Sequence, residues 1–212
     1  MHDLILFGIQ GSGKGTQARM LEEKDGYKVF ETGKELRAMS ASGSELGNKV
    51  KGIIEAGNLV PDSVVIEIVE EFLKRTPSEH AVIFDGIPRK ITQKDLFEKV
   101  VEKFGRKPLG VLIQASDELA LKRLSGRHMS KKTGKIYPSN EAALKECPPE
   151  DVYQRSDDTP DAIRTRLKNY HAETQSVIDW YRGEGRLVEV DGQKEAEEVL
   201  EELMQKILNP KS

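Results

Sequence analysis

The chain has 212 residues, of which 37% are hydrophobic and 33% charged, and its formal net charge is -3. This length allows one or two domains, and the small negative charge excludes a general affinity for nucleic acid or an anionic membrane. The single cysteine, Cys147, excludes an internal disulfide and suits a reducing compartment. No apolar run approaches membrane-spanning length, and no leader-like segment precedes the first predicted strand. We therefore expect a cytoplasmic protein of enzyme size.

Residues 4–17, LILFGIQGSGKGTQ, combine an apolar strand, a glycine-rich turn and the start of a helix. Glycines allow backbone N–H groups to face phosphate oxygens, the helix N-terminus adds positive potential, and a lysine reaches the β and γ phosphates. Gly8, Gly13 and Lys14 fit the pattern G-x-x-x-x-G-K-[ST], although Gly15 takes the place of the hydroxyl residue. The stretch predicts a nucleotide phosphate site. The alternative is a glycine-rich turn with a solvated lysine.

Beyond this loop the chain alternates between strand and helix patterns. Further strands are predicted at residues 27–30, 81–85, 109–114 and 187–190. Helices are predicted at residues 16–24, 33–40, 44–55, 61–73, 96–104, 117–124, 160–181 and 199–207. Strands separated by helices predict an α/β fold, a three-layer phosphate-loop (P-loop) architecture with a parallel sheet flanked by helices. Ligands of such sheets lie beyond the carboxyl ends of the strands.

Two segments interrupt this alternation, at residues 31–60 and 127–158. We interpret them as inserted flaps, an acceptor-binding segment and a lid, which close over substrates and exclude water. The core domain would then consist of residues 1–30, 61–126 and 159–212.

Arginines gather at the bases of both flaps and in the helix after the second flap. They are Arg37, Arg89, Arg123, Arg127, Arg155 and Arg166. One arginine alone is more often a solvated residue or an ion-pair partner, and we leave Arg164 in that class. Together with a polyphosphate loop, the set suits phosphoryl transfer, which needs alignment and charge neutralisation. Asp85 ends a strand at the same sheet edge and is the candidate for organising Mg²⁺, the alternative being a cap for the turn at Gly86.

Several further segments are the most specific indication of the protein family. They are TGKELR (32–37), GNLVPD (57–62), DGIPR (85–89), RLSGR (123–127), QRSDD (154–158), RTRL (164–167) and DGQK (191–194). With GIQGSGKGTQ (8–17), they resemble the motifs of the adenylate kinase family, in the same order and nearly from end to end. The resemblance implies ATP as donor, AMP as acceptor, ADP as product and Mg²⁺ as cofactor. It also implies a monomer without nucleic-acid or membrane partners.

The resemblance also implies roles for individual residues. ATP would contact Gly11, Ser12, Gly13, Lys14, Gly15, Thr16, Arg123, Arg127, Ile136, Tyr137 and Lys194. AMP would contact Thr32, Arg37, Asn58, Leu59, Val60, Gly86, Ile87, Pro88, Arg89, Gln93, Arg155 and Arg166. The catalytic residues would be Lys14, Arg89, Arg127, Arg155 and Arg166. Gln93 would read adenine by paired hydrogen bonds. Thr32 and Gln93 usually differ in the related pyrimidine kinases, so they favour AMP over UMP or CMP.

Three residues depart from the family pattern. Gln10 replaces a proline in the phosphate loop, and Ile87 replaces a phenylalanine. Lys34 replaces an aspartate near the expected water shell of the metal, which predicts a modest loss of Mg²⁺ dependence.

The second flap lacks the C-x-x-C pairs by which some relatives bind zinc. Ser130 and Thr133 stand at the first pair, so a zinc site is not expected. These two hydroxyls supply half of a polar network that could replace the metal, whereas Lys145 and Pro148 do not clearly supply the rest.

Two alternatives to an ATP:AMP phosphotransferase remain. One is another nucleoside monophosphate kinase, with UMP or CMP as acceptor or GTP as donor. The other is a non-catalytic nucleotide-binding module, supported only by Gln10 and Lys34. The complete arginine set argues against the module, because a binder has no use for groups matched to a transition state.

Overall fold

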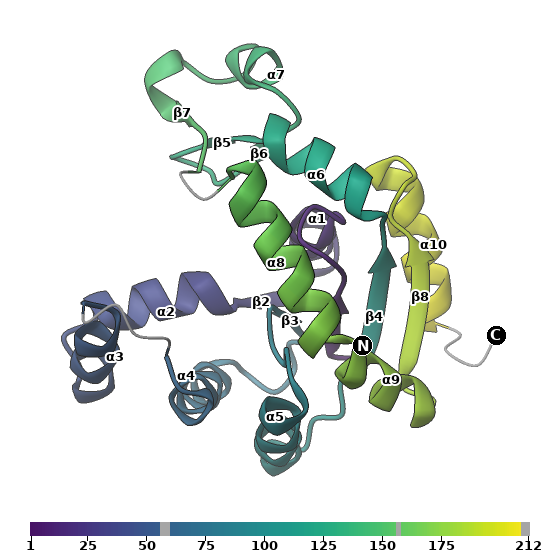
Figure 1. Cartoon of the computed structure of the whole chain (residues 1–212). Coiled ribbons are helices and arrows are strands. Elements are labelled where there is room, and N and C mark those ends of the chain that lie inside the picture. The colour runs from purple at the N-terminus through teal and green to yellow at the C-terminus, as the bar shows by residue number, and fades with distance from the viewer. Residues whose placement is uncertain (56–59, 156–157, 209–212) are drawn as a thin grey trace.

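The core of the protein is a five-stranded parallel sheet in the order β2-β3-β1-β4-β8 (Figure 1). This computed structural model describes residues 1–55, 60–155 and 158–208. The strands are β1 (Leu4–Phe7), β2 (Lys28–Glu31), β3 (Val82–Asp85), β4 (Leu109–Gln114) and β8 (Leu187–Asp191). The predicted α/β fold with a parallel sheet is confirmed.

The helices of the described residues are α1 (Lys14–Asp25), α2 (Thr32–Ala41), α3 (Glu45–Glu55), α4 (Asp62–Arg75), α5 (Ile91–Lys103), α6 (Asp117–Gly126), α7 (Asn140–Leu144), α8 (Pro160–Glu173), α9 (Gln175–Gly183) and α10 (Ala196–Leu208). Helices α4, α5 and α9 pack on one face, while α1 and α10 pack on the other. Because both faces are covered, β1 is buried along its whole length and its sequence, LILF, is continuously apolar.

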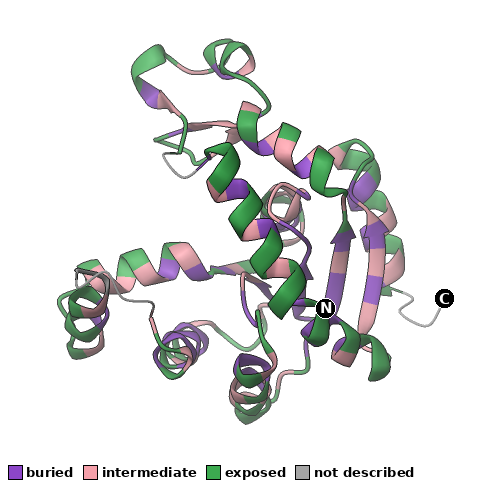
Figure 2. Cartoon of the chain, viewed as in Figure 1, coloured by how far each residue is buried: buried purple, intermediate pink, exposed green. Residues whose placement is uncertain are grey.

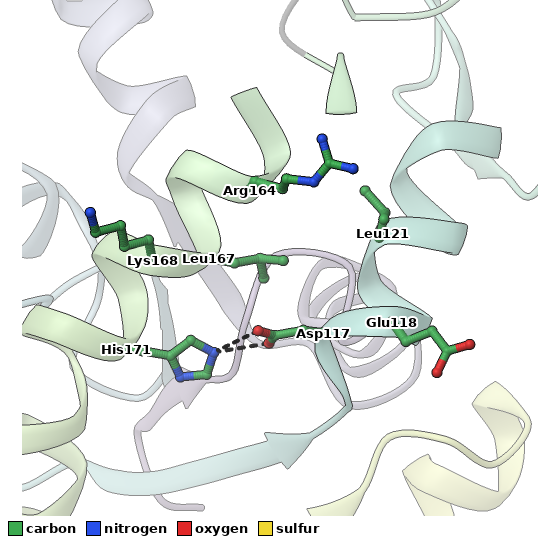
Figure 3. Close-up of a pocket in the computed structure, with 7 residues that line it drawn as sticks. All are labelled: Asp117, Glu118, Leu121, Arg164, Leu167, Lys168 and His171. Atoms are coloured by element: carbon green, nitrogen blue, oxygen red, sulfur yellow. Dashed lines mark hydrogen bonds and ion pairs between the residues drawn. The ribbon is translucent and has the colours of Figure 1, made fainter. Parts of the chain in front are cut away.

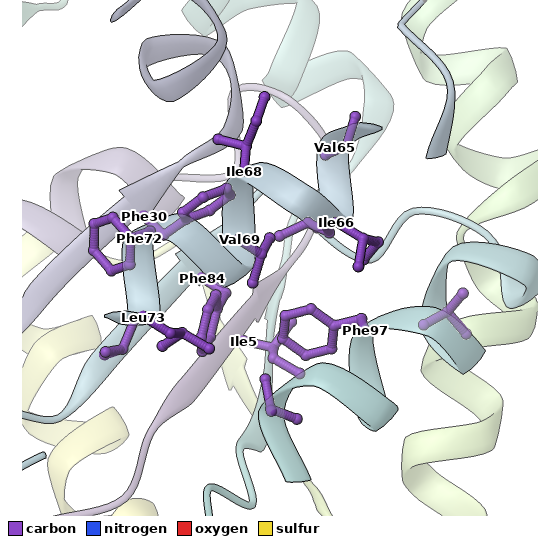
Figure 4. Close-up of a cluster of buried hydrophobic side chains, with 14 of the residues drawn as sticks. Ile5, Phe30, Val65, Ile66, Ile68, Val69, Phe72, Leu73, Phe84 and Phe97 are labelled. Carbon is purple, nitrogen blue, oxygen red and sulfur yellow. The ribbon is translucent and has the colours of Figure 1, made fainter. Parts of the chain in front are cut away.

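An aromatic cluster joins the sheet to α4 and α5 (Figure 4). The rings of Phe84 and Phe97 lie 4.9 Å apart edge to face, and Phe30 meets Phe72 in the same way at 5.3 Å. Figure 2 shows that the flanking helices carry buried residues on the side facing the sheet and exposed residues on the outer side. This is the outcome expected from the 3.6-residue spacing of their apolar positions.

The register of the sheet aligns the carboxyl ends of its strands. Leu6 of β1 pairs with Asp85 of β3, and Gln114 of β4 pairs with Asp191 of β8. The central strand β1 lies between β3 and β4, which is where the connections diverge in opposite directions along the sheet. The glycine-rich loop that follows β1 therefore lies at the point where doubly wound sheets bind ligands.

The prediction of one helix over residues 160–181 was wrong. The structure ends α8 at Glu173 and begins α9 at Gln175. At the junction, the Thr174 carbonyl accepts hydrogen bonds from the N–H groups of both Val177 and Ile178, at 3.1 Å each. Thr174 keeps near-helical angles, φ -85° and ψ -23°, so the apolar period continues across a break that periodicity alone does not detect.

A second, antiparallel sheet in the order β6-β5-β7 lies beyond α6, at the top of Figure 1. Its strands are β5 (His128–Ser130), β6 (Ile136–Tyr137) and β7 (Val152–Tyr153), and a 3₁₀ turn, η1 (Pro149–Asp151), precedes β7. Strands of two or three residues are too short to produce a readable period, which explains the irregular pattern of this segment.

A buried polar network holds this small sheet together. The Ser130 Oγ donates to the Asp151 Oδ2 at 2.6 Å, and the Thr133 N–H donates to the Ser130 Oγ at 3.0 Å. The Ser130 hydroxyl therefore takes part as the sequence suggested, whereas Thr133 joins it through its backbone N–H and its hydroxyl accepts from the Lys135 N–H at 3.2 Å. Asp151, rather than Lys145 or Pro148, provides the acceptor. In the part of the chain that the structure describes, no group of three His, Cys, Asp or Glu residues could hold a metal ion.

We expect Asp151→Asn to lower the melting temperature of the protein at pH 7 by about 2–4 °C. The hydrogen bonds from Ser130 and the Lys132 N–H hold the pKa of the Asp151 carboxyl below its ordinary value of 3.8. A depressed carboxyl pKa contributes stability that is present above the unfolded-state pKa and is lost as the pH falls through the folded-state pKa.

Melting curves between pH 3 and pH 7 test this prediction. The difference between Asp151→Asn and the unchanged protein should shrink below about pH 4. Glu150→Gln is the matched control, because Glu150 is an exposed neighbour in the same turn. Equal melting temperatures of Asp151→Asn and the unchanged protein at pH 7 would contradict the role of Asp151 in stabilising the small sheet.

Candidate active site

The phosphate loop connects β1 to α1 at the centre of the sheet edge. Gly8 has a φ of +142°, and a Cβ atom there would lie 2.6 Å from the Ile113 carbonyl oxygen, so the position requires glycine. Gly13, with φ +109°, precedes α1, and its carbonyl accepts from the Thr16 N–H at 3.0 Å. The loop thus joins a strand to a helix N-terminus through glycines with positive φ, the arrangement that is typical of anion-binding loops.

Lys14 reaches back across this loop. Its Nζ donates to the carbonyl oxygens of Gly8 at 2.6 Å and Ile9 at 3.0 Å. An ammonium has three N–H donors, so one donor remains for an anion. Burial lowers the pKa of Lys14, while the nearby carboxylate of Asp85 acts in the opposite direction and Arg89 adds to the lowering. The arrangement places a half-buried lysine near the end of β3.

The acceptor-side residues meet at the end of β3. The Thr32 Oγ1 donates to the Asp85 carbonyl at 3.2 Å, and the Arg89 Nε donates to the Gly86 carbonyl at 2.9 Å. The Arg89 N–H donates to the Gln93 Oε1 at 2.8 Å. A Cβ on Gly86 would lie 3.1 Å from the Arg89 Nη2 and 3.2 Å from the Thr32 Oγ1. The structure therefore brings these predicted residues together around one glycine.

The other predicted AMP contacts lie around this cluster or outside the described residues. Ile87 is buried in the core beneath α4 and α5, followed by Pro88 after a cis peptide bond. Val60 packs against the same core, and Arg37 is exposed on α2, 4.0 Å from a carboxylate oxygen of Glu31. Asn58 and Leu59 lie outside the described residues.

Between the end of α6 and the start of α8, arginines gather around one carboxylate. The Arg127 Nε and Nη2 donate to the two Asp158 oxygens at 2.8 and 2.7 Å, and the Arg166 Nη2 lies 3.2 Å from Oδ1. The Asp158 side chain is completely buried. The Arg155 carbonyl accepts from the Asp158 N–H at 3.1 Å, so the third arginine belongs to the same turn. Asp158 holds two of the predicted catalytic guanidinium groups in fixed orientation.

Sequence reasoning did not assign Asp158 a role. Its only signal was its place in QRSDD, between two arginine-bearing segments. An aspartate near several arginines is indistinguishable from a surface residue until the fold shows that it is buried.

Arg123 links α6 to two loops of the nucleotide edge. Its Nη1 donates to the Gly192 carbonyl at 2.8 Å and lies 3.4 Å from the carbonyl oxygens of Gly11 and Ser12. This position is compatible with a donor base lying against the guanidinium plane, and that contact stays a prediction.

The remaining predicted ATP contacts, Ile136, Tyr137 and Lys194, lie in different surroundings. The Ile136 Cδ1 lies 3.9 Å from the position that a Cβ would take on Gly15, so the lid sheet reaches the start of α1. The Tyr137 hydroxyl instead lies within the lid, 3.3 Å from the Cys147 Sγ. Lys194 forms an ion pair with Glu202 at 2.8 Å.

A separate hollow lies between α6 and α8 (Figure 3). Leu121 and Leu167 lie on its two sides, and the His171 Nε2 is 2.9 Å from the Asp117 Oδ1. Arg164 lines this hollow and pairs with Asp161 at 3.2 Å, as expected of a surface ion pair. None of the residues predicted to bind nucleotide lines it.

Asp85 is the described residue that fits the expected Mg²⁺. Mg²⁺ is commonly held by one or two carboxylates, with waters and substrate phosphates completing the octahedron. Asp85 is partly buried at the strand end next to the phosphate loop, which suits that mode without a protein-only ligand set. Lys34 is exposed in the first turn of α2, and the predicted loss of Mg²⁺ dependence stays a prediction.

A glycine loop at the switch point of a parallel sheet, with a half-buried lysine in it and two arginines held by one buried aspartate, defines a protein of the phosphate-loop nucleotide-binding class. The sequence profile of the family described as adenylate kinase matches residues 6–186. The chain is 36% identical to an adenylate kinase of Fusobacterium nucleatum, over 95% of this chain and 96% of that protein. It is 39% identical to those of Caldicellulosiruptor bescii and Methanosarcina acetivorans, with the same coverage. The chain therefore belongs to the adenylate kinase family.

Among the described helices, none is both long and apolar enough to cross a membrane.

Proposed function

We propose that the protein catalyses the reversible transfer of a phosphoryl group from Mg-ATP to AMP, giving two ADP. The observation that carries the proposal is the position of the phosphate loop with Lys14 beside the acceptor cluster around Gly86, because β1 and β3 pair at the strand ends that precede them. Two further arginines, Arg127 and Arg166, are oriented by Asp158 between α6 and α8. The relatives named adenylate kinase support the same reaction.

The proposed transfer is an in-line displacement. A phosphate oxygen of AMP attacks the γ-phosphorus of ATP, the new P–O bond forms, and the bond to the β-phosphate oxygen breaks to release ADP. The attacking oxygen is already ionised, so no general base is required. Lys14 and the backbone of residues 11–16 would hold the donor phosphates, and Arg127, Arg155 and Arg166 would neutralise charge across the transfer. Bound Mg²⁺, held by Asp85 through water, would add charge neutralisation on the donor phosphates.

The acceptor would be positioned by Arg37 and Arg89 on its phosphate and by Thr32 and Gln93 near its base. Residues 31–60 and 127–158 would close over the substrates, and closure excludes the water that would otherwise hydrolyse ATP. We further propose that the protein acts as a monomer in the cytoplasm and has no nucleic-acid partner. The family resemblance, the single cysteine and the net charge of -3 support these proposals.

The test is ADP production from AMP and Mg-ATP, measured beside UMP, CMP and GMP as acceptors. We expect turnover with AMP to exceed turnover with the pyrimidine nucleotides by a wide margin. Equal or faster turnover with UMP or CMP would overturn the proposed acceptor and leave the phosphoryl-transfer mechanism in place. ATP binding without turnover of any acceptor would favour a non-catalytic nucleotide-binding module.

A further inference from the structure

Asp62 contacts Gln93, the residue that is expected to form hydrogen bonds with the base of the acceptor nucleotide. It lies in the first turn of α4, directly after residues 57–61. Its Oδ1 accepts from the Gln93 Nε2 at 3.1 Å, and its Oδ2 accepts from the Thr92 Oγ1 at 3.3 Å and forms an ion pair with the Lys90 Nζ at 3.0 Å. On the other side of the same carboxamide, the Gln93 Oε1 accepts from the Arg89 N–H at 2.8 Å.

These two partners determine which way the Gln93 carboxamide faces. An ionised carboxylate only accepts hydrogen bonds, and a backbone N–H only donates. A flip of the carboxamide by 180° would place its oxygen against the Asp62 carboxylate and its NH₂ against the Arg89 N–H. Gln93 is only 7% exposed, so water cannot easily compensate for either mismatch. The oxygen therefore faces Arg89 and the nitrogen faces Asp62.

The fixed carboxamide retains one lone pair on its oxygen and one N–H on its nitrogen. A purine with an amine at position 6 offers a donor beside a ring-nitrogen acceptor. A purine with a carbonyl at position 6 offers an acceptor beside a ring N–H donor. A carboxamide that can flip satisfies either pattern, whereas a fixed one satisfies a single pattern.

We propose that Asp62 is a positioning residue that locks the Gln93 carboxamide and so makes the acceptor site discriminate 6-amino from 6-oxo purines. The inference rests on the proposed function, in which Gln93 contacts the acceptor base. Asp62 acts through Gln93 and does not itself need to touch the nucleotide.

A purely structural role for Asp62 makes a different prediction. A carboxylate in the first turn of a helix is favoured by the helix dipole, and its ion pair with Lys90 is partly exposed. Loss of these interactions would lower stability and leave base selectivity unchanged. Selectivity between two purines is therefore the readout that separates the two roles.

The experiment compares kcat/KM for AMP and for inosine monophosphate (IMP), which carries the 6-oxo pattern, in the unchanged protein and in Asp62→Asn. Asparagine has the same shape, but it can turn its own NH₂ toward a flipped Gln93. We expect the AMP-to-IMP ratio of kcat/KM to fall by about tenfold, with the value for IMP rising. The Arg89 N–H still opposes the flip, so the loss of selectivity should be partial.

Two control variants separate the effect of the Asp62–Gln93 hydrogen bond from other effects of the substitution. Lys90→Met removes the ion pair with Asp62 but leaves the contact with Gln93, and Asp117→Asn removes a first-turn carboxylate from α6. Both should keep the AMP-to-IMP ratio of the unchanged protein. An unchanged ratio in Asp62→Asn, with or without a lower melting temperature, would overturn the inference and leave the proposed function standing. No turnover of AMP by the unchanged protein would overturn the proposed function itself.

Discussion

Replacing Lys14 by methionine is expected to lower kcat for ADP formation from AMP and Mg-ATP by about a thousandfold. The Lys14 Nζ is held inside the phosphate loop by the carbonyl oxygens of Gly8 and Ile9, and its third N–H remains available to the proposed polyphosphate. Methionine has a similar length but supplies neither charge nor donor. Charge that develops on the transferred phosphoryl group would lose a preorganised cation.

Steady-state rates with saturating AMP and Mg-ATP measure this effect. Lys24→Met is the matched control, because Lys24 lies exposed in the last turn of the same helix. The control should retain the kcat of the unchanged protein. A kcat for Lys14→Met within tenfold of that value would contradict the proposed role of the loop.

Replacing Arg127 by lysine is expected to lower kcat by about a thousandfold, the lower end of the effect of an arginine in phosphoryl transfer. Lysine keeps the charge but cannot form the two parallel hydrogen bonds that Arg127 makes with Asp158. The buried Asp158 would retain Arg166 as a partner, at 3.2 Å, so the variant should remain folded.

The comparison uses Arg164→Lys, which alters an exposed arginine of α8 paired with Asp161. Both variants are assayed at a temperature at which their melting curves show them to be folded. The control should show the unchanged kcat. If Arg127→Lys matched the control, charge alone would suffice at this position and the bidentate pair with Asp158 would have no role in catalysis.

Local signals in the sequence predicted much of the fold. Ser116 caps α6 by accepting from the Leu119 N–H at 3.2 Å, and Thr159 caps α8, with Pro160 in the first helical position. Caps, glycine turns and apolar periods depend on neighbours within a few residues, so they can be read directly from the order of amino acids.

The roles of three aspartates are apparent only in the folded protein. Asp158 meets Arg127 across 31 positions of the chain, Asp62 meets Gln93 across 31, and Asp151 meets Ser130 across 21. The sequence around a carboxylate does not distinguish one that faces water from one that contacts a buried partner. The distinction depends on which segments the sheet topology places side by side.

The sequence by itself therefore determined the class of the fold, and it predicted the phosphate loop and the arginines proposed to act with it. The tertiary structure decided which acids orient those groups, how Gln93 faces and where the helix after the lid divides at Thr174. The physical reason is the distance along the chain between the residues that interact. Backbone turns and amphipathic faces follow from contacts between near neighbours in the chain. The orientation of a buried polar side chain follows from partners that only folding brings within 3 Å or so.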